Sequence, residues 1–275
     1  MALVTMNFES EYLYSNHEIS IILPDKPRSL TAKEFYSSGK KYKVLWLLHG
    51  TFGDHSDWLR KSNIELYACE KDLIVVMPSA LNSNYSDWPD YMIGYKMFSY
   101  LTEELMPLVY NWFPASDKRE DNFIAGLSMG GGGAIKYAVN YPEKFAAAAI
   151  LSSAPRNLHK IDPKDTDPKN KRQQVSIRNA GGYDNYVNSY ENSWDKLAEL
   201  APTGKLPKLY FACGKNDFLY DMFREFRAYA EEIELAATFE EIEGFTHEWR
   251  FWDLTIQHAL TFFGLDQEDE AGNPF

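Results

Sequence analysis

Cysteine and long hydrophobic runs are both scarce in this sequence. Its 275 residues include only Cys69 and Cys213, which are isolated and show no paired spacing, so a disulfide-stapled scaffold and a cysteine zinc site are excluded. We predict two reduced, buried thiols. The longest purely apolar stretch covers residues 145–151, far short of the roughly 20 residues that span a bilayer. The N-terminus lacks a basic region followed by an apolar core, so we expect a cytoplasmic protein without a signal peptide or a membrane partner.

Positive charge is in deficit. The chain has 28 Lys and Arg residues against 40 Asp and Glu residues, which gives a formal net charge of −12 at pH 7. Such a chain repels polyanions, so nucleic acid and anionic membrane surfaces are poor partners. Its 45% hydrophobic content is enough for a full core, and we expect a single domain over residues 1–275.

Strand-like runs alternate with helical patterns along the chain. Residues 2–23 alternate apolar and polar side chains, with turn-like residues at 15–17, which predicts antiparallel edge strands. Further strands are predicted at 44–48, 73–77, 123–125, 146–151, 209–212 and 238–242. A helical pattern over 98–112 contains Pro107, which should kink or break that helix. The alternation predicts an α/β fold with a mostly parallel central sheet flanked by helices.

Residues 155–207 interrupt this rhythm. They separate two predicted strands by more residues than a simple crossover helix requires, and they begin with a polar, proline-bearing stretch. An insertion at this point would lie over the carboxyl edge of the sheet, where ligands bind in such folds. We therefore predict a small cap, with a surface excursion unrelated to the substrate as the alternative.

The stretch from Asn122 to Gly133 holds the candidate nucleophile. A buried strand runs directly into Gly126-Leu-Ser128-Met-Gly130, and a helical pattern follows. This spacing is typical of a sharp turn that lifts a serine hydroxyl clear of the sheet, with glycines where side chains would collide. The competing interpretation is a glycine-rich turn that only packs a helix tightly on a strand.

A serine hydroxyl needs a base, and that base needs an orienting acid. His247 lies in the loop between the last predicted strand and the last helix, whereas His258 falls inside that helix, so we favour His247. Asp217 lies just past the preceding strand and is better placed than Asp221. Asp217 could also serve simply as a helix N-cap.

Acyl transfer also needs hydrogen-bond donors for the developing oxyanion. The Met129 amide follows the nucleophile directly, and the loop after an early strand should supply the second donor, with Thr51 preferred and Phe52 as runner-up. A metal site built from His49, Asp54, His55 and Asp57 fits no common spacing. We therefore predict neither a metal nor a cofactor.

With these segments the chain resembles the putative esterases of the α/β-hydrolase fold. That family includes tributyrin-type short-chain esterases, esterase D or S-formylglutathione hydrolases, feruloyl esterases and mycolyltransferases. The resemblance covers about residues 10–263 and is carried by Leu47-Leu-His-Gly50 with Gly53 and Trp58, Tyr85-Ser-Asp-Trp88, Gly126-Leu-Ser-Met-Gly-Gly131, Gly214-x-x-Asp217 and His247-Glu-Trp-Arg-Phe-Trp252. It implies a triad of Ser128, Asp217 and His247, hydrolysis of small acyl esters, no cofactor and, in some members, homo-oligomers. Relatives often carry a larger residue within 130–133, where this chain has four glycines.

The expected substrate is a small ester with a short acyl chain. Aromatic residues in predicted loops could contact it, and we single out Phe52, Trp58, Trp88 and Trp194, although simple core or rim packing would also explain such residues. Feruloyl or acetyl-sugar esters and S-formylglutathione-type thioesters are alternatives. An acyltransferase would use the same triad, and a catalytically silent binding protein on this fold is the remaining hypothesis.

Overall fold

The computed structural model describes residues 2–265, and within them the main sheet has eight strands in the order β1-β2-β4-β3-β7-β8-β9-β10. These strands are β1 Ala2–Ser10, β2 Ser15–Leu23, β3 Val44–Leu48, β4 Ile74–Pro78, β7 Asn122–Leu127, β8 Ala147–Leu151, β9 Lys208–Gly214 and β10 Ala237–Ile242. The pairs β1–β2 and β2–β4 are antiparallel, and all other pairs are parallel. The predicted α/β class with a mostly parallel sheet is therefore confirmed.

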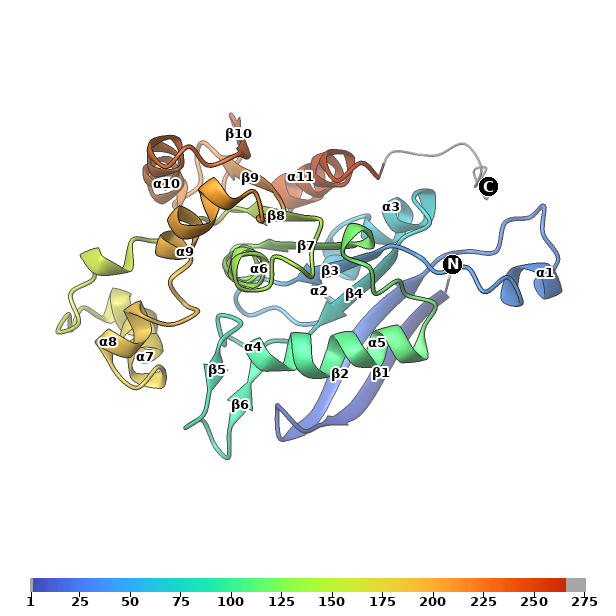
Figure 1. The fold of residues 1–275 in the computed structure, drawn as a ribbon, viewed down its shortest axis with the longest axis horizontal. Coiled ribbons are helices and arrows are strands. Elements are labelled where there is room, and N and C mark those ends of the chain that lie inside the picture. Colours follow the sequence, from blue (N-terminus) through green and yellow to red (C-terminus); the bar gives the residue numbers. More distant parts are fainter. Residues whose placement is uncertain (1, 266–275) are drawn as a thin grey trace.

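Helices cover both faces of the sheet (Figure 1). One face packs against α4 Met97–Ser99, α5 Met106–Trp112, α6 Met129–Asn140, α9 Ser193–Leu200 and α10 Tyr220–Glu232, and the other against α2 Asp57–Lys61, α3 Ile64–Glu70 and α11 Trp249–Phe262. Every residue of β3, β4 and β8 is buried. Along β3, Trp46 faces the first layer while Leu45 and Leu47 face the second, as the two-residue repeat of a strand requires.

The helix expected to kink or break at Pro107 continues through the proline and changes its geometry just before it. Residues Tyr100–Leu105 form a π-helix (η1) that joins α4 to α5, and the Met106 amide donates to the Leu101 carbonyl five residues back. Pro107 then stands in the first turn of α5. The wider π turn lets the helix pass the proline, and a missing N–H costs little at such a position.

The first hairpin also differs from expectation. The turn lies between Ser10 and Ser15, not at 15–17, because Asn16 and His17 pair with Glu9 and Phe8 inside the sheet. A smaller hairpin pairs β5 Asp87–Trp88 with β6 Tyr95–Lys96. Two further short helices in the first half of the chain are α1 Ala32–Tyr36 and η2 Arg119–Asp121. Within residues 2–265 no helix is both long enough and apolar enough to cross a bilayer.

Between β8 and β9 the chain leaves the sheet and returns (Figure 1). It forms η3 Leu158–Lys160, η4 Pro168–Asn170, α7 Lys171–Asn179 and α8 Tyr183–Val187, then α9 and η5 Ala201–Thr203. Trp194 and Leu197 of α9 belong to the main core. Residues 155–192, the part of the 155–207 insertion that precedes α9, are called the cover segment, and near its end Tyr190 stacks on Phe98 of α4.

Candidate active site

Ser128 occupies a strained turn between β7 and α6. Its backbone has φ +52° and ψ −116°, a conformation that a residue with a side chain rarely adopts and that often marks a functional position. A methyl group on Gly126 would lie 2.3 Å from the Gly130 carbonyl carbon, and one on Gly130 would lie 2.5 Å from the Leu48 carbonyl oxygen. Only glycine fits at either position, so the local packing accounts for both flanking residues.

Asp217 and His247 are in direct contact at the carboxyl ends of β9 and β10. His247 Nδ1 lies 2.8 Å from Asp217 Oδ2, and the other carboxylate oxygen accepts the Leu219 amide at 2.9 Å. The Asp217 side chain is fully buried, whereas that of His247 is 18% exposed. Burial alone would raise the pKa of Asp217, but hydrogen bonds from His247, the Leu219 amide and the Ser152 hydroxyl outweigh it and leave the pKa below its usual value. The acid is therefore ionised beside the imidazole.

A cavity of about 320 Å³ lies against Ser128. Thr51, Met129 and Phe218 also line it, and the Phe218 ring packs on His247 with ring centroids 4.6 Å apart. Phe218 thus connects the cavity that Ser128 lines with the Asp217–His247 pair, which stands behind that ring and does not itself belong to the cavity lining. Other lining residues come from the cover segment and its flanks, namely Ser153, Ala154, Pro155, Arg156, Leu158, Arg172, Gln173, Ser176, Tyr186, Glu191 and Ser193.

The two loops expected to hold oxyanion donors both reach the cavity. Met129 is the first residue of α6, a position whose N–H has no partner inside the helix. The Phe52 amide donates to Asn82 Oδ1 at 2.9 Å, whereas no hydrogen bond within residues 2–265 engages the Thr51 amide. This difference favours Thr51 over Phe52. His49 shapes the loop, because its Nε2 accepts the Ala80 amide at 2.8 Å and burial lowers the pKa of its imidazole.

A family model described as putative esterase matches residues 10–263. The chain belongs to this family. An acetyl esterase from Caldicellulosiruptor saccharolyticus is 34% identical over 264 residues, which cover 94% of this chain and 97% of that protein. Two solved structures from Staphylococcus aureus are also similar. The fluorophosphonate-binding serine hydrolase F shares 32% identity at a TM-score of 0.79, and an S-formylglutathione hydrolase shares 31% at 0.76. Each alignment covers 95% of this chain and 98% of the other.

These findings establish a carboxylic-ester hydrolase of the serine-hydrolase type, and the family resemblance read from the sequence is confirmed. Asp217 and His247 touch, and Ser128, Met129 and Thr51 line the cavity beside them. Within the described part of the chain, no three metal-ligating side chains gather into a cluster.

The four aromatic residues expected to contact substrate do not line the cavity beside Ser128. Trp58 is 1% exposed and donates from Nε1 to the Leu48 carbonyl at 3.1 Å. Trp194 stacks on Tyr229 in the core, and half-buried Trp88 packs beside Tyr91. Phe52 is 90% exposed. None of the four lines the cavity, because the tryptophans fasten their segments to the esterase core.

Sequence reasoning missed the residues that hold the acid and base in place. The Trp252 indole donates to the Ser152 hydroxyl at 3.0 Å, and Ser152 in turn bonds the Asp217 carboxylate. Trp252 also packs edge-on against His247 at 5.0 Å. The one available signal was position, because Ser152 comes directly after the buried strand β8. Polar residues at such strand ends commonly belong to a site.

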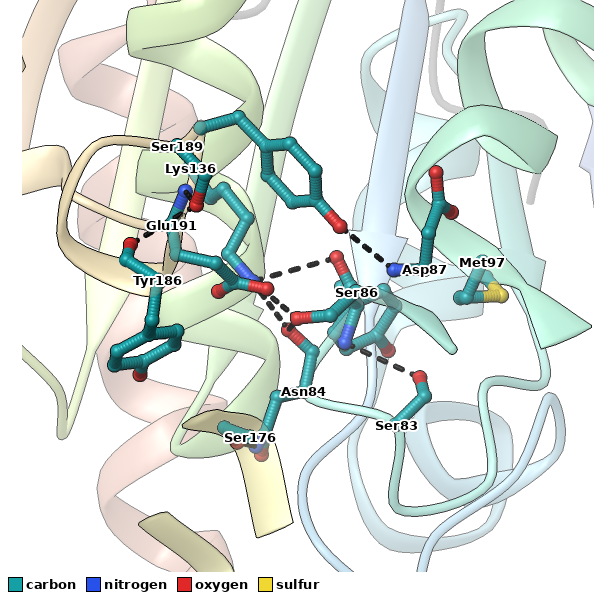
Figure 2. A network of polar contacts seen from close by, with 12 residues as sticks. Ser83, Asn84, Ser86, Asp87, Met97, Lys136, Ser176, Tyr186, Ser189 and Glu191 are labelled. Carbon is teal, nitrogen blue, oxygen red and sulfur yellow. Dashed lines mark hydrogen bonds and ion pairs between the residues drawn. The ribbon is translucent and has the colours of Figure 1, made fainter. Parts of the chain in front are cut away.

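A buried ion pair joins the cover segment to the nucleophile helix. Lys136 of α6 is 5% exposed, and its ammonium lies 2.6 Å from Glu191 Oε2. Figure 2 shows the ammonium between this carboxylate and the loop before β5, where it donates to Ser86 Oγ at 2.6 Å and to the Asn84 carbonyl at 3.0 Å. The same loop reaches α7, because Asn84 Nδ2 lies 3.1 Å from Ser176 Oγ. The network ties the cover segment to α6 and to the loop before β5, and its members Asn84, Lys136, Ser176 and Glu191 line the cavity.

Proposed function

We propose that this esterase hydrolyses small, short-chain acyl esters through an acyl-enzyme intermediate. The observation that carries the proposal is the contact between His247 Nδ1 and the buried Asp217 carboxylate, beside the cavity that the strained Ser128 lines. In this arrangement the acid orients the imidazole, and the second ring nitrogen is left for the serine hydroxyl.

The proposed reaction has two steps. The Ser128 oxygen attacks the ester carbonyl while His247 takes its proton, and the carbonyl oxygen becomes negative between the Thr51 and Met129 amides. The carbon–oxygen bond to the alcohol then breaks, and His247 returns the proton to the departing alcohol. Water next attacks the acyl-serine, again with His247 as the base, and releases the carboxylic acid and free Ser128.

The volume of the cavity and the names of similar proteins both favour a small acyl group. A cavity of about 320 Å³ is at the small end of ligand sites, and a similar protein is named acetyl esterase. A thioester substrate is the second candidate, because a structure at 31% identity is named S-formylglutathione hydrolase. Acyl transfer to an added alcohol would use the same residues, and product analysis with such an acceptor separates it from hydrolysis.

The test replaces Ser128 by alanine. With para-nitrophenyl acetate, Ser128→Ala should lower kcat by about 10⁶, as in other serine hydrolases. An organophosphonate probe should label residue 128 in the parent protein and nothing in the cavity of the variant, as read by peptide mass spectrometry. Ser37→Ala, on an exposed turn after α1, is the matched control. Parental activity in Ser128→Ala would overturn the assignment of the nucleophile.

A further inference from the structure

Two arginines border the cavity without a carboxylate partner. Arg156 follows β8, Arg172 lies in α7, and neither forms an ion pair within residues 2–265. Arg172 Nη1 donates to Thr51 Oγ1 at 2.7 Å, and Arg156 Nε donates to Met222 Sδ at 2.9 Å. Each guanidinium has five N–H donors, so most of them remain available at the solvent-accessible mouth.

The charge of the cavity opposes that of the whole protein. Its charged lining residues are Arg156, Arg172, Lys136 and Glu191, and the last two neutralise each other. The lining therefore carries two positive charges in a chain whose net charge is −12. Although the chain has an excess of carboxylates, none of them pairs with these two arginines within residues 2–265. Their place at one small cavity therefore favours a binding role over a general contribution to surface charge.

The two arginines line the same cavity, where each guanidinium lies in the electrostatic field of the other. The pKa of Arg172 is lowered, chiefly by partial burial and secondly by the positive charge of Arg156. The Arg172 guanidinium nevertheless stays charged at physiological pH, because the pKa of an arginine lies far above it. An anion between them would relieve this repulsion, and a guanidinium binds a carboxylate through two parallel hydrogen bonds.

We propose that Arg156 and Arg172 form a carboxylate-binding subsite at the mouth of the cavity, so that the preferred esters carry a carboxylate in their acyl or alcohol part. This inference rests on the proposed ester hydrolysis at Ser128 and adds the substrate class. The alternative is that Arg172 merely supports the Thr51 loop. That role would slow neutral and anionic esters equally, whereas a subsite discriminates between them.

The experiment compares matched esters in the full-length protein. For the alcohol part, the pair is para-acetoxybenzoate and the neutral para-acetoxybenzamide. For the acyl part, it is para-nitrophenyl monoadipate and its methyl ester. The readout is the ratio of kcat/KM for the anionic ester to that for the neutral ester. The pair that shows the larger ratio identifies the part of the substrate that carries the charge.

We expect the parent ratio to exceed one in at least one pair. Arg156→Gln and Arg172→Gln should each lower it by about tenfold, the lower end for hydrogen bonds to charged groups at a partly exposed site. Added salt should shrink the parent ratio, because screening weakens the attraction. Arg178→Gln, on the same helix but outside the cavity lining, is the control, and its ratio should match that of the parent.

Two results would overturn the subsite while leaving ester hydrolysis intact. One is a Ser128-dependent parent activity with a ratio near one in both pairs. The other is an equal loss on anionic and neutral esters in the Arg172→Gln variant. Calorimetric binding of para-acetoxybenzoate and its amide to Ser128→Ala supplies a readout without turnover. If this protein binds the carboxylate more tightly than the amide, and the arginine variants lose that preference, the subsite is supported. Absence of ester hydrolysis in the parent protein would then contradict the proposed function and leave the subsite standing.

Discussion

The central sheet and the cover segment are built by different means. Strands β3, β4 and β8 are buried along their whole length, whereas α7 buries only Ser176 and Ile177 and α8 only Val187. Apolar burial stabilises the sheet and its turns, while the polar cover segment depends on specific contacts such as the Lys136–Glu191 pair. If the proposed function holds, we expect residues at the carboxyl edge of the sheet to set the rate and the cover segment to influence which substrates bind.

The largest effect on activity should come from residues at the carboxyl ends of the parallel strands. Asp217→Asn should lower kcat for para-nitrophenyl acetate by about 10⁴, because the amide no longer holds the correct imidazole tautomer or stabilises the imidazolium. Asp221→Asn, one helical turn further on and exposed, is the matched control and should stay near the parental rate. Equal losses in the two variants would mean that the acid had been assigned to the wrong carboxylate.

The next effect concerns the anchor of the cover segment. Glu191→Gln leaves the buried Lys136 ammonium without its counter-charge and should cost roughly 3 kcal/mol of unfolding free energy, measured with urea. The double variant Lys136→Met with Glu191→Gln should recover part of that loss. Glu225→Gln removes the exposed partner of Lys160 and should change little. A small effect of Glu191→Gln would show that the cover segment does not depend on this pair.

A pH effect of similar or smaller size should come from β2, which lies between β1 and β4 in the antiparallel part of the sheet. His17 in β2 is packed against Tyr100, and burial lowers the pKa of its imidazole to about 4. The unfolded chain takes up this proton near pH 6.5. Stability should therefore be complete above about pH 6.5 and fall by roughly 3 kcal/mol as the pH drops to about 4, because only the unfolded state is protonated in that window. The measurement is unfolding free energy against pH for the parent and His17→Phe, and identical slopes would contradict the expectation.

The smallest effect tests the glycine run that opens α6. A methyl group on Gly132 would meet only Ser153 Oγ at 3.8 Å, whereas one on Gly133 would lie 2.7 Å from the Tyr85 ring. Gly132→Ala should therefore raise the unfolding free energy by about 0.5–1 kcal/mol through helix propensity, and it should raise KM for bulky acyl groups by narrowing the cavity. Gly133→Ala should lower the unfolding free energy. Thermal unfolding of both variants, with KM for acetyl and octanoyl esters, checks the pair.

The sheet and its turns could be predicted because the constraints there are local. Continuous apolar runs mark strands that are covered on both faces, and the site residues stand within a few positions of their ends. At the nucleophile turn, Gly126 is required by its contact with Gly130 four residues on, whereas Gly130 is required by the close approach of Leu48 at the end of β3. The strand runs and the spacing of the two glycines nevertheless appear directly in the order of the residues.

The cover segment and the surroundings of the cavity could not be predicted in the same way. A sequence pattern does not show whether a loop tryptophan turns outward or, like Trp58, turns inward and satisfies its N–H on a core carbonyl. Nor does it show that Lys136 and Glu191, far apart in the chain, neutralise each other in the interior. Nor does the sequence show that Arg156 and Arg172 line the same cavity in the folded chain.

The buried pair also limits how substrate can arrive. The Lys136 ammonium that binds Glu191 belongs to α6, the helix that begins directly after Ser128. A movement of the cover segment away from α6 would therefore leave a buried charge without its partner. We therefore expect the entrance to the cavity to keep one shape. Substrates would then be selected by their size and charge as they enter, and no lid would close over them after binding.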